Sequence, residues 1–151
     1  HDQDDLRCWP GGVEIVVSVD ANTRLVETFF EVMWNTWDDA VMREILHRDI
    51  DFRGSIGLHV IGHDAFAGYM QTIRNAFSDF HNTIEEIVAT EDRAVARLTY
   101  TGTHVGKLFE HEATGRRIEY AGVAMFTLAD GKITKVWVLG DRLALVEQIR
   151  D

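Results

Sequence analysis

The hydrophobic positions of the chain follow a helical spacing in its first half. Between residues 22 and 37, apolar side chains recur three and four positions apart, which predicts an amphipathic helix. Thr36, followed three residues later by Asp39, resembles a capping box and predicts a second helix through about residue 47. A third stripe, with apolar residues at spacings of four, three and four, predicts a helix over residues 63–77.

Elsewhere the spacing is that of strands. Residues 49–55 alternate, with Ile50 and Phe52 on one face and charged residues on the other, which predicts a short half-buried strand before an expected loop at 54–62. The signal Asp130-Gly131 predicts a hairpin turn. Beyond the third helix we expect four strands and a closing helix, at residues 83–90, 93–103, 116–129, 133–139 and 143–149.

Three helices with one early strand, followed by four consecutive strands, are an α+β order rather than alternating βα units. Long adjacent antiparallel strands curl because sheets twist. We therefore expect a cone-shaped, curved antiparallel sheet wrapped around the N-terminal helices, with a pocket between them. Residues 1–21 do not share this pattern, and we expect a poorly defined N-terminal arm or a segment added to the natural chain. Residues 22–151 are then a single domain.

Composition narrows the class of protein. With 151 residues and 46% hydrophobic content, the chain is long enough for one domain with a core. A net charge of −10 disfavours nucleic acid and anionic membranes as partners. The single cysteine, Cys8, excludes an internal disulfide and fits a reducing compartment. The acidic start lacks the basic region of a signal peptide, so we expect a cytoplasmic protein.

No strong local motif marks a catalytic centre. The seven histidines are scattered, and we expect neither a metal nor another cofactor. The most notable carboxylate is Asp141, directly after the last strand. It either caps the closing helix, by accepting from the amide of Leu143 or Ala144, or acts as an acid or base in a pocket.

Four other polar residues are candidates for the pocket. Arg53 is either an exposed strand residue or a partner for Asp141 or an anionic substrate. His81 and His104 lie at strand ends, where a histidine is either a structural residue or a catalytic one. Tyr120 is either a core tyrosine or a donor to a substrate oxygen.

Several segments together resemble a known family. The runs are Ser78–His81, Thr101–Gly106, Ala113–Arg117 and the stretch from Gly131 through Trp137 to Asp141. In this order and spacing they are similar to the SnoaL-like polyketide cyclase and ester cyclase group of the nuclear transport factor 2-like superfamily, and the likeness covers roughly residues 22–149. The resemblance implies a cone-shaped α+β barrel that is usually dimeric. A homodimer would cover the outer sheet face, for which Val95, Val123 and Met125 are the candidates.

The resemblance also implies a reaction. Family cyclases close a polyketide ring by intramolecular aldol condensation without metal or cofactor, using an Asp on the late strand as acid and base. In this chain that position is Val138, and a histidine of the preceding strand corresponds to Ala124. The acid that remains is Asp141.

We therefore expect a cofactor-independent enzyme of cyclase or isomerase type that acts on a small hydrophobic carbonyl or polyketide-type compound. Asp141 would be the acid and base, with Tyr120, His104 or Arg53 polarising an oxygen. The expected substrate-binding residues are His81, Ala124, Val136, Val138, Trp137 and Phe52. One alternative is a non-catalytic module that binds an apolar small molecule in the same cone. A lesser alternative is an activity like limonene-epoxide hydrolase, which needs an Arg and two acids around a water.

Overall fold

The computed structural model of the chain describes residues 12–150. The helices are α2 (Gly12–Glu27), the π-helix η1 (Thr28–Trp34), α3 (Asp39–Ile45), α4 (His63–Ala76) and α5 (Arg142–Ile149). The strands are β1 (Leu46–Arg53), β2 (His59–Ile61), β3 (His81–Ala89), β4 (Arg93–Thr103), β5 (Arg117–Ala129) and β6 (Lys132–Gly140). The α+β class expected from the hydrophobic pattern is confirmed.

The six strands form one sheet in the order β2-β1-β6-β5-β4-β3. The expectation of an antiparallel sheet is wrong for one pair, because β1 runs parallel to β6. These two strands are joined through α4 and the four strands β2 to β5 rather than by a hairpin, so the chain can bring β6 back in the same direction as β1. The expected loop at residues 54–62 also contains β2, which pairs antiparallel with β1.

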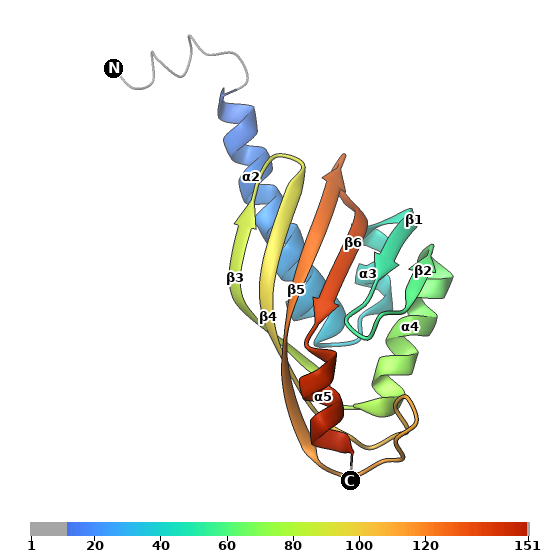
Figure 1. The fold of residues 1–151 in the computed structure, drawn as a ribbon. Helices are drawn as coiled ribbons and strands as arrows, with labels where there is room; N and C mark the ends of the chain where they lie inside the picture. The colour runs from blue at the N-terminus through green and yellow to red at the C-terminus, as the bar shows by residue number, and fades with distance from the viewer. Residues whose placement is uncertain (1–11, 151) are drawn as a thin grey trace.

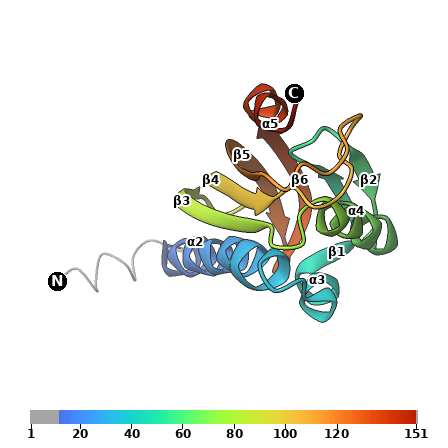
Figure 2. The ribbon, with the colours of Figure 1, turned by 90° about the horizontal axis from the view of Figure 1, so that it is seen from below.

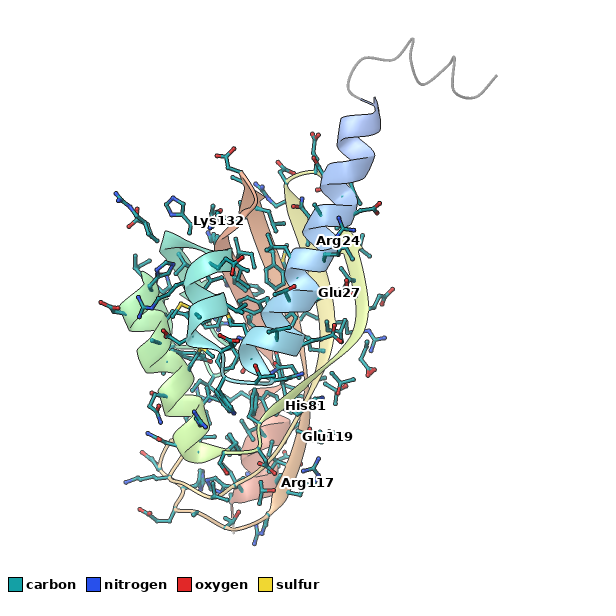
Figure 3. All side chains as sticks on the ribbon, turned by 180° about the vertical axis from the view of Figure 1, so that it is seen from behind. Arg24, Glu27, His81, Arg117, Glu119 and Lys132 are labelled. Carbon is teal, nitrogen blue, oxygen red and sulfur yellow. The ribbon has the colours of Figure 1, made fainter. Side chains whose placement is uncertain are left out.

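The sheet curves around the helices. The long strands β3 to β6 bend along α2 and η1, and α5 follows β6 at the end of the sheet where the chain terminates (Figure 1). A view along the strands shows α2, α3 and α4 on one side of the sheet (Figure 2). Side chains fill the space between these helices and the strands (Figure 3). The concave face is therefore the core of the molecule.

The first two helices, α2 and α3, begin at other residues than the sequence pattern predicted. The boundary expected after residue 21 lies inside α2, and the Asn22 side chain donates to the carbonyls of Thr90 and Glu91 at 3.0 and 2.9 Å. These bonds tie α2 to the turn between β3 and β4. The cap of α3 is Asp38, whose carboxylate accepts from the amide of Val41 at 3.0 Å, and not Thr36.

Alternation along the central strands separates core from surface. On β4 and β5, every second residue is buried, which is the period of a strand with one covered face. Small residues at Ala96 and Ala124, which pair across β4 and β5, leave room for rings from the helices. Phe126 meets Phe29 and Phe30 edge-on, with ring centroids 5.2 and 5.8 Å apart. This aromatic packing holds η1 against the sheet.

Candidate functional site

A small cavity lies inside the cone, between the helices and the concave face of the sheet. Its volume is about 20 Å³, which is enough for a water molecule. Most of its walls are aromatic. It is lined by Phe29, Phe30, Trp34, Phe52, Ser55, Tyr69, Ile73, Phe80, Asn82, Tyr100 and Val138. A few polar atoms therefore face a mostly apolar space, which is the usual composition of a small-molecule site.

Hydroxyl groups gather on one side of this cavity. Ser55 Oγ lies 2.9 Å from the hydroxyl of Tyr120, and the Tyr120 ring lies 4.8 Å from that of Tyr100. The Tyr100 ring can lie against the backbone of Gly122 because glycine has no side chain. A Cβ at this position would lie 2.5 Å from the ring. A Cβ on Gly54, next to Ser55, would overlap the hydroxyl of Tyr69. Tyr69 of α4 and Tyr120 of β5 thus flank Ser55, and Tyr100 of β4 packs on Tyr120. Of the three tyrosines, Tyr69 and Tyr100 line the cavity.

Burial keeps all three tyrosines protonated. It raises the pKa of Tyr69 to about 12, although hydrogen bonding to Ser55 acts in the opposite direction. Burial also raises the pKa of Tyr120 and that of Tyr100 well above the ordinary value of 10.0. A phenol that keeps its proton is a hydrogen-bond donor at neutral pH, so the cavity offers neutral donors rather than charges.

A pair of asparagines holds the other polar edge. Asn82 lines the cavity at the start of β3, and its backbone amide donates to Oδ1 of Asn35 at 2.8 Å. The Asn35 side chain donates in return to the Asn82 carbonyl at 3.0 Å. These bonds fix the end of η1 against β3, and with it the cavity wall that η1 carries.

Of the residues expected to bind substrate, two line the cavity. Phe52 and Val138 do so from β1 and β6. Ala124 and Val136 are buried on the same face of the sheet but are not among the lining residues. Trp137 is on the opposite face, because neighbouring strand residues alternate between faces.

Asp141 lies at the surface, outside the cavity. The strand β6 ends at Gly140, and the carboxylate of Asp141 accepts from the Ala144 amide at 3.1 Å as the cap of α5. Of the two roles open to this residue, the structure displays the cap. None of the residues that line the cavity carries a carboxylate.

Arg53 also lies outside the cavity. Its guanidinium is 5.2 Å from the ring centroid of Trp137 and donates to the carbonyl of Val138. Among residues 12–150 it forms no ion pair with Asp141. The arrangement expected for an epoxide hydrolase, an Arg with acids around a water, is therefore not assembled in this cavity.

The two histidine candidates occupy contrasting places. His81 is exposed at the start of β3. His104 is fully buried beside Phe77, with ring centroids 5.8 Å apart, and is not a lining residue. The amide of Thr114 donates to its Nδ1 at 3.2 Å, so Nε2 carries the proton. Burial lowers the pKa of His104, which keeps the ring neutral.

The polar residues that do line the cavity were not among the expected site residues. Ser55, Tyr69, Asn82 and Tyr100 lie on four different segments. The position of Tyr100 could have been predicted from the sequence, because Tyr100 alternates in step with Ala96 and Leu98 and therefore lies with them on the inner face. Ser55 and Tyr69 had none, because their position depends on how α4 and the segment after β1 pack over the sheet.

The described part of the chain was also compared with the geometry of a metal site and of a membrane-spanning helix. Over residues 18–150, whose side chains are described, no three side chains of His, Cys, Asp or Glu come together as metal ligands. None of the described helices has the length and apolar character to cross a bilayer.

An aromatic cavity inside an α+β cone defines the class of this protein, and sequence comparison identifies the family. The chain belongs to the SnoaL-like polyketide cyclase family, whose model matches residues 24–149. The resemblance noted from the short motifs is thus confirmed. No curated protein matches the sequence significantly.

Solved structures share the fold. A protein from Jannaschia sp. CCS1, assigned as a SnoaL-like polyketide cyclase, aligns with a TM-score of 0.79 at 22% identity, over 86% of this chain and 92% of its own. TsrD from Streptomyces laurentii aligns with a TM-score of 0.75 at 25% identity, over 86% and 95%. IdmH from Streptomyces antibioticus, assigned as a polyketide cyclase, aligns with a TM-score of 0.73 at 23% identity, over 83% and 96%.

Proposed function

We propose that the protein binds a small hydrophobic carbonyl compound of polyketide type in its cavity and promotes cofactor-independent cyclase-like chemistry on it. The observation that carries this proposal is the set of neutral hydroxyl donors, from Tyr69, Tyr100 and Ser55, around an aromatic cavity. Family membership and the polyketide cyclase assignments of IdmH and the Jannaschia protein support the substrate class.

Neutral phenols suit the activation of a carbonyl. A donor aimed at a carbonyl oxygen stabilises the negative charge that develops there when an enol carbon of the same substrate attacks the carbonyl carbon, and the proton that the enol releases ends on that oxygen. Because burial raises the pKa of Tyr69 and Tyr100, both keep the proton that such a bond needs. The surrounding aromatic rings exclude water and strengthen the bond.

A ring system does not fit into about 20 Å³, so binding requires the walls to move apart. The movable wall in this proposal is η1, which contributes Phe29, Phe30 and Trp34. A π-helix is a rare conformation that occurs often at functional sites. Ligand entry would therefore be accompanied by displacement of side chains on η1.

The proposal is tested by turnover of short aromatic polyketide-type diketones in single variants. We expect Tyr100→Phe to lower kcat by about 100-fold, because removal of one donor to a developing oxyanion has that order of effect. Asp141→Asn should leave kcat unchanged, since its carboxylate caps α5. The opposite result, with turnover lost in Asp141→Asn and kept in Tyr100→Phe, would restore the acid-base role expected from the sequence and reject the hydroxyl mechanism.

One observation favours a second candidate function. The lining residues include neither a carboxylate nor an imidazole that could accept a proton from the substrate. The same cavity could then serve a binding module that holds an apolar compound without converting it. Native mass spectrometry after incubation separates the two functions, because a binding module retains the unchanged ligand and an enzyme releases a product of altered structure.

A further inference from the structure

A second hollow lies on the opposite face of the sheet from the cavity, at the end formed by β1 and β2. Its volume is about 370 Å³, far larger than that of the cavity. It is lined by Asp51, Arg53, Gly57, His59, Lys135, Val136 and Trp137. We refer to these seven residues as the outer groove.

Strand register explains why polar side chains meet in the outer groove. Arg53 on β1 is paired with His59 on β2 and with Trp137 on β6. Asp51, two positions earlier on β1, is paired with Lys135. Residues two apart on a strand point to the same face, so these side chains share the outer face of the sheet.

The charge of the outer groove is positive although the whole chain is acidic. Asp51 is its one carboxylate, and Oδ1 of Asp51 already lies 2.6 Å from Nε2 of His59. Arg53 and Lys135 remain, and among residues 18–150, whose side chains the structure describes, neither has a carboxylate within 4.0 Å. Arg53 and Lys135 therefore give the outer groove a positive charge within a chain whose net charge is −10.

A third cation approaches from α5. A Cβ built on Gly57 would lie 3.9 Å from Nη1 of Arg142 and 4.0 Å from Nη2 of Arg53. Both guanidinium groups therefore face the same glycine, whose φ of +92° is unfavourable for a residue with a side chain. No side chain at this position separates the two groups.

Aromatic rings hold both arginines in place. The Arg142 guanidinium is 4.1 Å from the ring centroid of Phe109, and that of Arg53 is 5.2 Å from the ring centroid of Trp137. Stacking orients the planar group. Nη1 of Arg53 donates to the carbonyl of Val138, whereas Nη2 faces Gly57. Among the side chains of residues 18–150, Arg142 also has no ion-pair partner.

We infer that the outer groove is a binding site for an oxyanion, a carboxylate or phosphate group of a small molecule, held between Arg53 and Arg142. Guanidinium groups bind these oxyanions through paired, charge-assisted hydrogen bonds. The ring of Trp137 lies 5.2 Å from the Arg53 guanidinium, so its indole is next to the proposed site. The site is independent of the proposed function, because the sheet separates it from the cavity.

The experiment is an NMR titration that follows the indole N–H of Trp137, identified by its absence in Trp137→Phe. The probes are benzoate, inorganic phosphate and benzamide, which is the neutral counterpart of benzoate. We expect saturable shifts with an oxyanion and none with benzamide. The tighter of benzoate and phosphate identifies whether the natural ligand carries a carboxylate or a phosphate. If neither benzoate nor phosphate saturates the shift at concentrations up to about 10 mM, the affinity is too weak for a binding site and the inference is overturned.

Variants show whether the arginines are responsible. Arg142→Gln, at an exposed position, should weaken binding about tenfold, which is the usual effect of losing one charge-assisted hydrogen bond. The matched control is Arg97→Gln, which removes the same charge from an exposed position on the outer face of β4. Equal weakening by both variants would indicate a general effect of charge and overturn the inference. Thermal melting of each variant confirms that it is folded.

Discussion

The two faces of one sheet illustrate how the same strands make two different surfaces. On the inner face, Ala124, Phe126 and Val138 are almost fully buried. On the outer face, their neighbours Met125 and Trp137 keep 50% and 40% of their surface exposed. Single steps along β5 and β6 thus move a side chain from the core to solvent.

The difference extends to the polar groups that each face accepts. The inner face contains neutral tyrosines whose pKa values are raised by burial. The outer face contains charged groups, including Arg53 and Asp51, and the carboxylate of Asp51 is hydrogen-bonded to His59. An isolated charge is costly in an apolar interior, whereas a protonated phenol is tolerated. Carbonyl chemistry by neutral donors therefore suits the inside, and recognition of anions suits the outside.

The largest expected effect tests the inner face. Phe126→Ala removes a ring that packs on Phe29 and Phe30, and should lower the free energy of unfolding by about 3–5 kcal/mol in urea denaturation. The control is Glu119→Ala, an exposed position on the same strand, which should change it by less than about 0.5 kcal/mol. Similar losses in both variants would contradict the division of β5 into two faces.

An intermediate effect concerns alkaline pH. The chain has three tyrosines, and all are buried with a raised pKa. Above the unfolded-state value of 10.0, the unfolded chain loses protons that the folded chain keeps, so the free energy of unfolding should fall as pH rises towards about 12. Ultraviolet absorbance should detect tyrosinate only on unfolding, and the fall should be shallower in Tyr100→Phe. Reversible ionisation near pH 10 in the folded protein would contradict this prediction.

The smallest expected effect on the stability of the folded chain comes from a substitution on the outer face of the sheet. We propose that a second copy covers the patch of Val95, Val123 and Met125, which are 37%, 38% and 50% exposed. Sedimentation velocity should detect a dimer at micromolar concentration, and Met125→Glu should shift it to monomer while changing the stability of the monomer by less than about 1 kcal/mol. Leu143→Glu, an exposed position on α5, is the control and should remain dimeric. A monomeric wild-type protein would reject the proposal.

Strand periodicity allowed part of the site to be predicted. Phe52 and Val138, both expected to bind substrate, lie on the inner face and line the cavity, but Trp137, expected in the same role, lies on the outer face. Asp141 is the exposed cap of α5, which is one of the two roles that its place before the closing helix allowed. Local rules of this kind hold because side-chain direction in a strand repeats every two residues.

The sequence by itself determined the α+β class, the family and the sides on which strand residues lie, since all of these depend on short-range spacing. Only the tertiary structure decided which side chains share a space. Ser55, Tyr69 and Tyr100 meet because separate segments pack against one concave sheet, and Arg142 reaches Gly57 because α5 lies next to the turn after β1. Such distances result from packing between segments far apart in the chain, and no local pattern of residues encodes them.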